Sequence, residues 1–314
     1  MPMTPSMASE QIRRHLATIP TNAQVEIAFF GGSFTAIPRS QMESLLQVAS
    51  PYLASGRVSS IRISTRPDAI DENVLSLLSS YGVKTIELGI QSISDKVLQA
   101  CNRGHTSADS YHAAELILAK NFTLGGQMMI GLPSSSDEDE LATAKALIEM
   151  GVTEARIYPV VVFSGTPLAD EMAIGRYVPL SVNDATRRTV SPLEALLEAN
   201  VTLLRVGLME TESLHSSGQI VGGAYHPALG ELCYSALFQK RIMNILSEMS
   251  LTEQSDLKIS VAPGKLSMAI GQKRWNDRAI KENHPVNSLR FAEDPSLSGF
   301  AVRVDLIQQT KGSI

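Results

Sequence analysis

The most constraining feature of this sequence is the alternation of short apolar, β-branched runs with longer segments of helical period. Such alternation is the pattern of repeated strand–helix units around a parallel sheet. The sequence therefore predicts an α/β fold. The six predicted strands occupy residues 25–30, 60–65, 85–90, 123–130, 154–163 and 201–208.

Start and stop signals of helices support this order of elements. Ser40 with Glu43, and Ser136 with Asp139, have the spacing of capping boxes. Glycines at 82 and 151 stand where the carboxyl ends of helices need a residue that tolerates a positive φ. Residues 7–20 also have the pattern of a helix, so we expect the chain to open with one.

Composition indicates an ordinary globular protein with a cytoplasmic location. Hydrophobic residues make up 44% of the 314 residues and charged residues 19%, without a run long enough to span a bilayer or an apolar secretory signal. The net charge is −5, yet residues 251–314 hold nine Lys and Arg against seven Asp and Glu. We therefore expect an anionic partner, if there is one, at the carboxyl-terminal region.

Polar motifs follow the predicted strands in a fixed order, at the end of the sheet where parallel α/β folds place their sites. Their ordered series resembles the radical S-adenosylmethionine (SAM) superfamily, especially its Elongator-like and coproporphyrinogen-dehydrogenase-like branches. The motifs are FFGGSFT at 29–35, RISTRPD at 62–68, ELGIQS at 87–92, NRGHT at 102–106 and QMMIGLP at 127–133.

The resemblance implies a partial (β/α)6 TIM-like barrel of the radical SAM type that lacks its first strand, followed by a small α+β extension. We expect the core to cover residues 1–214 and the accessory region residues 215–314. The implied activity is hydrogen-atom abstraction after SAM cleavage, with a tRNA base as a candidate substrate and flavodoxin or ferredoxin as the electron donor. Function follows from the site, however, not from the fold.

The loop after the first predicted strand is the first candidate contact for SAM. Gly31 and Gly32 remove side chains, so the backbone can approach the methionyl group, and backbone carbonyls and the Ser33 hydroxyl can accept from its ammonium. The resemblance assigns the methionyl carboxylate to Arg103, whose guanidinium can bind it with two hydrogen bonds. A tight turn remains the structural alternative for the two glycines.

Three further polar residues complete the predicted cofactor site. The resemblance places Ser64 and Gln91 near the nucleoside and methionine ends of SAM, and Gln127 near the ribose hydroxyls. Glu87 is given a secondary role. We expect His105 to cap the following helix, and Cys101 to pack as a small buried thiol.

The cysteine motif that defines the reactive centre of this superfamily is missing. A C-x-x-x-C-x-x-C loop would supply three thiolates to a 4Fe-4S cluster, whereas this sequence holds only Cys101 and Cys233. The first strand and this loop are expected before Met1 in a longer form. We predict no metal ligands in this chain, and that by itself it neither assembles the cluster nor cleaves SAM.

The carboxyl-terminal region holds two further motifs. A glycine- and proline-rich segment at 221–232 resembles one in bacterial Elongator-like proteins, where Tyr225 and His226 are weak candidates for catalytic residues. The sequence GQKR at 271–274 is similar to the G-x-x-G turn of KH domains, although Arg274 replaces the second glycine. A rigid loop and a basic solvated helix are the structural alternatives.

Two other classes of protein stay open at this point. The first is a non-catalytic RNA-binding protein that uses its basic tail on an inactive barrel. The second is a hydrolase or aldolase on an ordinary barrel, which would use the glycine turn to hold phosphate. The strand ends offer no lysine or metal-ligand cluster for the second class.

Overall fold

The computed structural model describes residues 3–209 and 219–307, and these form two compact units. The first unit comprises Met1–Tyr158 with Ala195–Arg205, and the second comprises Pro159–Glu194 with Val206–Ile314. The predicted boundary between residues 214 and 215 lies outside the described residues.

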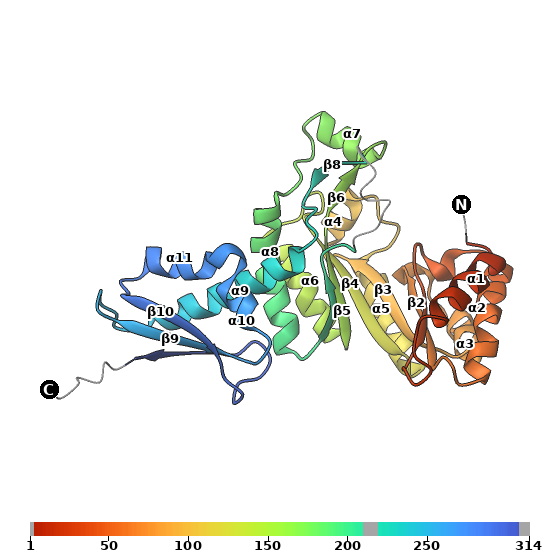
Figure 1. The fold of residues 1–314 in the computed structure, drawn as a ribbon. Coiled ribbons are helices and arrows are strands. Elements are labelled where there is room, and N and C mark those ends of the chain that lie inside the picture. Colours follow the sequence, from red (N-terminus) through yellow and green to blue (C-terminus); the bar gives the residue numbers. More distant parts are fainter. Residues whose placement is uncertain (1–2, 210–218, 308–314) are drawn as a thin grey trace. The chain divides into compact units, whose positions relative to one another are not determined.

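The first unit is an open, curled half-barrel of six parallel strands, in the order β1-β2-β3-β4-β5-β7 (Figure 1). The strands stand in the sheet in their order along the chain, although β6 (Val161–Phe163), which lies between β5 and β7 in sequence, belongs to another sheet. The strands are β1 (Glu26–Phe29), β2 (Ser60–Thr65), β3 (Val83–Gln91), β4 (Thr123–Ile130), β5 (Glu154–Pro159) and β7 (Thr202–Val206).

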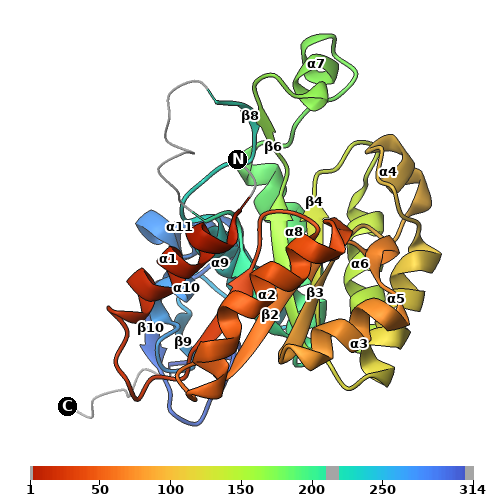
Figure 2. The ribbon, with the colours of Figure 1, turned by 90° about the vertical axis from the view of Figure 1, so that its right-hand side faces the viewer.

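Helices pack on one face of this sheet, as Figure 2 shows for α3, α5 and α6 beside β3 and β4. Between them lie fully buried aliphatic side chains such as Leu75, Leu88 and Leu124. The helices of this unit are α1 (Pro5–Leu16), η1 (Phe34–Ala36), α2 (Arg39–Ala54), η2 (Pro67–Ala69), α3 (Glu72–Ser80), α4 (Asp95–Ala100), α5 (Ser107–Ala119) and α6 (Asp137–Glu149). The α/β class and the partial barrel predicted from the sequence are confirmed.

Three of the four helix-end signals in the sequence are confirmed and one is wrong. Ser136 and Asp139 form the expected capping box of α6, and Gly82 and Gly151 have φ values of 81° and 78°. The Ser40 prediction is wrong, because α2 already begins at Arg39 after Pro38 and Ser40 lies within its first turn. The Glu43 carboxylate instead accepts from Arg39 Nε at 2.9 Å.

The second unit begins where the predicted strand 154–163 divides. Pro159 ends β5, and β6 (Val161–Phe163) pairs antiparallel with β8 (Ile220–Gly223) in a separate two-stranded sheet. Gly223, with φ 94°, allows the two backbones to approach, because a Cβ there would lie 2.5 Å from the Val160 carbonyl oxygen. Two helices, α7 (Pro167–Ala173) and α8 (Val182–Glu198), follow β6.

The carboxyl-terminal part of this unit is the predicted small α+β extension. Its sheet has the order β10-β9-β11, with β10 parallel and β11 antiparallel to β9. The core between sheet and helices includes Phe238, Ile242, Ile259 and Ile280, each 0% exposed. The elements are α9 (Leu229–Ser247), β9 (Asp256–Val261), α10 (Leu266–Ile270), η4 (Gln272–Arg274), α11 (Trp275–Asn283), β10 (Ser288–Glu293) and β11 (Val302–Leu306).

Within residues 3–209 and 219–307, no helix combines the length and the apolar character that a membrane crossing requires.

Candidate SAM site

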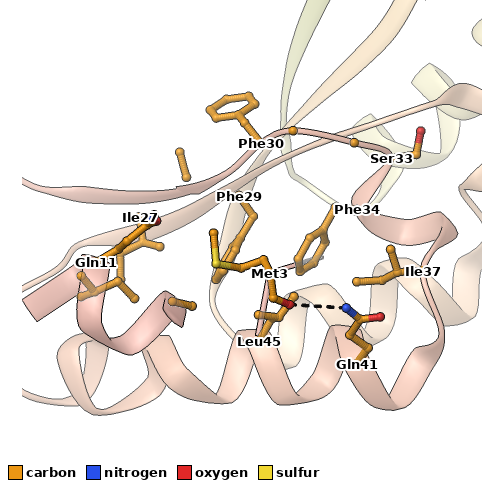
Figure 3. A pocket seen from close by; sticks show the side chains of 15 residues that line it. Met3, Gln11, Ile27, Phe29, Phe30, Ser33, Phe34, Ile37, Gln41 and Leu45 are labelled. Atoms are coloured by element: carbon orange, nitrogen blue, oxygen red, sulfur yellow. Dashed lines mark hydrogen bonds between the residues drawn. The ribbon is translucent and has the colours of Figure 1, made fainter. Parts of the chain in front are cut away.

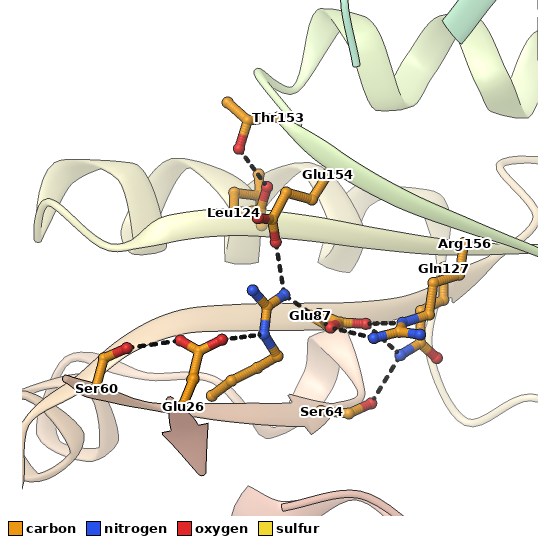
Figure 4. A network of polar contacts seen from close by, with 10 residues as sticks. Glu26, Ser60, Ser64, Glu87, Leu124, Gln127, Thr153, Glu154 and Arg156 are labelled. Atoms are coloured by element: carbon orange, nitrogen blue, oxygen red, sulfur yellow. Dashed lines mark hydrogen bonds and ion pairs between the residues drawn. The ribbon is translucent and has the colours of Figure 1, made fainter. Parts of the chain in front are cut away.

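Charged side chains form a continuous network across the face of the half-barrel opposite the helices (Figure 4). At its centre is Glu87 of β3, whose side chain is 1% exposed. Arg62 of β2 donates to Glu87 at 2.9 Å, and also to Glu26 of β1 at 2.8 Å and Glu154 of β5 at 2.5 Å. Arg156 of β5 donates to both Glu87 oxygens, at 2.8 and 3.2 Å. Three carboxylates and two guanidinium groups thus cross-link four strands.

Two of the predicted SAM contacts belong to this network. The Gln127 Nε2 atom donates to Ser64 Oγ at 3.1 Å and to Glu87 Oε2 at 3.0 Å. Space for Glu87 depends on Gly125, where a Cβ would lie 2.7 Å from Glu87 Cγ. The structure therefore brings Ser64 and Gln127 together.

The network keeps Glu87 ionised at neutral pH. Burial raises the pKa of Glu87, but hydrogen bonds from Arg156, Gln127 and Arg62 outweigh it and hold the pKa below its ordinary value. Glu154, Glu26 and Glu87 likewise outweigh burial to raise the pKa of Arg62. Glu87 is thus a fixed acceptor that orients donors, and a proton donor at neutral pH would need a different group.

The carboxyl end of β3 presents a buried amide with an unused acceptor. Gln91 has a left-handed backbone, with φ 66°, and is 8% exposed. Its Oε1 atom is buried and has no hydrogen-bond partner among the residues that the structure describes. Gly89 makes room for this side chain, since a Cβ there would lie 2.9 Å from Gln91 Nε2. An unpaired buried carbonyl is costly, so this atom fits a site whose donor comes from a ligand.

The loop after β1 contains Gly31, Gly32 and Ser33, beside a cavity of about 370 Å³. Gly31 has φ 104°, and a Cβ at either Gly31 or Gly32 would meet no atom of the described residues within 4 Å. Figure 3 shows Phe29 and Phe34 on the cavity side, and their rings stack 5.0 Å apart. The loop therefore has open space on its surface, as close approach of a ligand to its backbone requires.

One contact connects this loop to the charged network. The exposed ring of Phe30 precedes Gly31, and the Arg156 guanidinium lies 5.2 Å from the centre of that ring. The face of an aromatic ring attracts a cation at this distance. Arg156 thereby connects the charged network around Glu87 with the loop that contains Gly31 and Gly32.

Arg103 and His105 follow α4 and have different environments. The Arg103 side chain is exposed and takes part in none of the ion pairs among the described residues. His105 is buried and its Nε2 atom donates to the Ile90 carbonyl at 3.1 Å. The expected cap is wrong for His105, because Thr106 caps α5 in a box with Asp109. His105 instead holds the 102–106 segment against the end of β3.

Tyr225 and His226 belong to the second unit. The Tyr225 hydroxyl is buried, and within residues 3–209 and 219–307 it has no hydrogen-bond partner. The His226 Nδ1 atom accepts from the backbone N–H of Ala228 at 3.1 Å, so this ring stabilises the turn into α9.

Sequence reasoning missed the ionic centre of the site. It gave Glu87 a secondary role and did not select Arg62, Arg156, Glu26 or Glu154. The available signal was a charged residue inside each of several otherwise apolar strands. No hydrogen bond among the described residues joins Gly31, Gln91 and Arg103 to one another, so these three are separate contact points.

These residues fit SAM and do not fit the cluster. An open glycine loop, with an amide oxygen and a guanidinium that have no partner in the described part of the chain, suits a ligand with an ammonium, hydroxyls and a carboxylate. Three cluster thiolates cannot come from two cysteines. Burial raises the pKa of Cys233 to about 12 and also raises that of Cys101, so neither is poised as a thiolate. The described residues contain no group of three or more His, Cys, Asp or Glu that could hold a metal ion.

Family models match most of the chain. The model of the radical SAM superfamily matches residues 2–147, and that of the radical SAM C-terminal domain matches residues 152–239. The chain belongs to the radical SAM superfamily.

Its relatives include Elongator-type proteins. The tRNA uridine(34) acetyltransferase of Methanocaldococcus jannaschii is 26% identical over 237 residues, which is 68% of this chain and 42% of that protein. Human Elongator complex protein 3 is 28% identical over 233 residues, with 67% and 42% covered. The matched region spans less than half the length of each relative.

A solved structure shares the fold. The archaeal Elp3 of Methanocaldococcus infernus, with residues 1–46 of its amino terminus deleted, superposes with a TM-score of 0.64 and 23% identity. The superposition covers 76% of this chain and 59% of that one.

Proposed function

We propose that this chain is the SAM-binding barrel of an Elongator-type radical SAM enzyme that acts on tRNA. The observation that carries this proposal is the buried, unpartnered Oε1 atom of Gln91 at the carboxyl end of β3. The relatives named above support the tRNA part, because one of them is a tRNA uridine(34) acetyltransferase.

Each predicted contact has a role that suits its environment. Backbone carbonyls of Gly31 and Gly32 and the Ser33 hydroxyl accept from the methionyl ammonium, and Arg103 binds the methionyl carboxylate. The amide of Gln91 accepts from the nucleoside.

Gln127 binds the ribose hydroxyls, and Ser64, whose hydroxyl accepts from Gln127 Nε2, contacts SAM beside them. Glu87 is a positioning residue, because its hydrogen bond fixes the orientation of the Gln127 amide. Tyr225 and His226 are proposed to face the substrate.

The reaction of the family would need ligands beyond those of this chain. When bound, a 4Fe-4S cluster supplies the electron that cleaves SAM, and the family then removes a hydrogen atom from its substrate. We propose that flavodoxin or ferredoxin reduces that cluster. The 314 residues alone are proposed to bind SAM without cleaving it.

An alternative function is RNA binding on a barrel that performs no chemistry. The observation that favours this alternative is that the sequence has only two cysteines, neither of which is poised as a thiolate. It predicts RNA binding that SAM does not alter.

Equilibrium dialysis with isotope-labelled SAM tests the proposal. We expect one bound SAM per chain, weaker binding by Arg103→Gln, and unchanged binding by Arg39→Gln, which removes an exposed arginine from α2. Absence of SAM binding by the folded protein would contradict the proposal. Reductive SAM cleavage after iron and sulfide treatment of the isolated chain would contradict the proposed inactivity.

A further inference from the structure

The turn between α10 and α11 in the second unit is not used by the SAM site. It consists of Gly271, Gln272, Lys273 and Arg274, and it connects two helices that pack with the sheet β10-β9-β11. In KH domains a G-x-x-G turn between two helices clamps the backbone of the nucleic acid.

The backbone of this turn is held in an unusual shape. Gly271, Lys273 and Arg274 have φ values of 78°, 49° and 59°, although only the first is glycine. The buried Asn276 fixes the turn from below, since its Nδ2 atom donates to the carbonyls of Ala269 and Ser235, each at 2.9 Å. The side chain of Asn276 thus holds the turn in a shape that keeps Lys273 and Arg274 on the surface.

Exposed cations lie on this turn and on the helix that follows it. Lys273 and Arg278 are exposed and pair with no carboxylate of the described residues. Arg274 uses its Nε atom for Asp277, at 3.0 Å, and its terminal nitrogens have no partner there. Arg278 and Lys281 are three residues apart and lie on one face of α11, and Arg274 directly precedes this helix.

The local charge contrasts with that of the whole chain. Residues 263–284 contain five Lys and Arg against two Asp and Glu, whereas the chain carries −5. One of those two acids, Asp277, is 5% exposed and forms ion pairs with Arg274 and Lys281. The exposed surface of this segment is therefore strongly cationic.

An aromatic ring lies next to these cations. Trp275 is the first residue of α11 and its side chain is 38% exposed. Aromatic side chains beside cations stack on bases in sites that follow the backbone of single strands. A surface that bound only free phosphate would have no use for this ring.

We propose that the 271–274 turn and the basic face of α11 bind the phosphate backbone of single-stranded RNA, with Trp275 stacked on a base. Lys273 holds one phosphate, and Arg274 and Arg278 hold its neighbours. This inference does not rest on SAM binding, because every residue in it belongs to the second unit.

Fluorescence anisotropy with a labelled single-stranded RNA, titrated at several salt concentrations, tests the proposal. For Lys273→Glu/Arg278→Glu in the full chain we expect affinity to fall on the order of tenfold or more, and the salt dependence to decrease, because phosphate contacts are lost. Trp275→Ala should weaken binding without changing the salt dependence. Lys84→Glu, at an exposed lysine of β3 in the first unit, is the matched control and should bind as the unaltered chain does.

Several results would overturn the proposal. They are failure of the unaltered chain to bind RNA, equal RNA affinity of the double variant and the unaltered chain, and equal losses in the double variant and Lys84→Glu. Unfolding in urea, measured on each variant, separates loss of binding from loss of fold. Binding to anionic lipid vesicles but not to RNA would assign the surface to membranes instead. Binding to a single-stranded DNA of the same sequence is measured as well. Stronger binding of this DNA than of the RNA would contradict the RNA assignment.

Discussion

Glu87 and Arg156 form a two-point ion pair that spans the intervening strand β4, with Nε 2.8 Å from Oε2 and Nη2 3.2 Å from Oε1. The same carboxylate accepts from Arg62 and Gln127, so one buried anion organises β2, β4 and β5. Because Gln127 is a proposed SAM contact, the stability of the barrel and the geometry of its site depend on the same group.

Removal of this anion should strongly destabilise the first unit. Glu87→Ala leaves two partly buried guanidinium groups without their shared partner, and we expect a loss of about 3–5 kcal/mol in the free energy of unfolding. Urea denaturation measures it. The control Glu72→Ala removes an exposed carboxylate 4.0 Å from Lys120 and should cost less than about 1 kcal/mol. Equal losses in both variants would contradict a central role for Glu87.

Stability should also fall in acid in a way that depends on Glu87. Its pKa in the folded state lies below the ordinary value of about 4.5, so its contribution to stability is fully present above about pH 4.5. That contribution is lost as the pH falls through the lower pKa of the folded state. The slope of unfolding free energy against pH below 4.5 should be smaller in Glu87→Gln than in the unaltered protein. Identical slopes would show that Glu87 is not held ionised by its partners.

Two glycines should differ sharply in their tolerance of a methyl group. Gly125→Ala places a Cβ against Glu87 Cγ, and we expect a loss of about 1–3 kcal/mol in stability from the resulting shift. Gly32→Ala meets no atom within 4 Å and should leave the free energy of unfolding nearly unchanged. Urea denaturation of the pair tests this, and a larger cost at Gly32 would contradict the described packing.

The two thiols should differ in reactivity. Cys233 is 0% exposed and its pKa is raised to about 12 by burial, whereas Cys101 is half-buried at the end of α4. Ellman's reagent should titrate one thiol in the native protein and two in urea. Reaction of both thiols in the native state, or of the Cys101→Ser variant before unfolding, would contradict the burial of Cys233.

Strands and helices of the first unit were predictable because their signals are local. The apolar runs at 60–65 and 123–130 coincide with β2 and β4, and the Ser136–Asp139 spacing coincides with a real capping box. The run 154–163 divides at Pro159, because proline has no N–H with which to continue the pairing of β5. The apolar character of the run did not show that its second half pairs with a different strand.

The site was less predictable because it depends on register and on unusual backbone conformations. Glu87 meets Arg156 only because two strands 69 residues apart lie on either side of β4. Gln91 and Lys273 have positive φ values, which nothing in their residue types indicates. The sequence alone did not show whether His105 or Thr106 caps α5, because both side chains can accept from a backbone N–H.

Isothermal titration of the 314-residue chain with SAM tests the central claim most directly. We predict saturable binding of one SAM per chain, a loss of about tenfold or more in affinity for Gln91→Leu, and an unchanged affinity for Gln99→Leu, a glutamine exposed on α4. Gln91→Leu should also unfold at the same urea concentration as the unaltered protein, since the Oε1 atom that it removes has no partner within the described chain. Equal SAM affinity in Gln91→Leu and the unaltered protein, or no SAM binding by the folded chain up to millimolar concentration, would contradict the account.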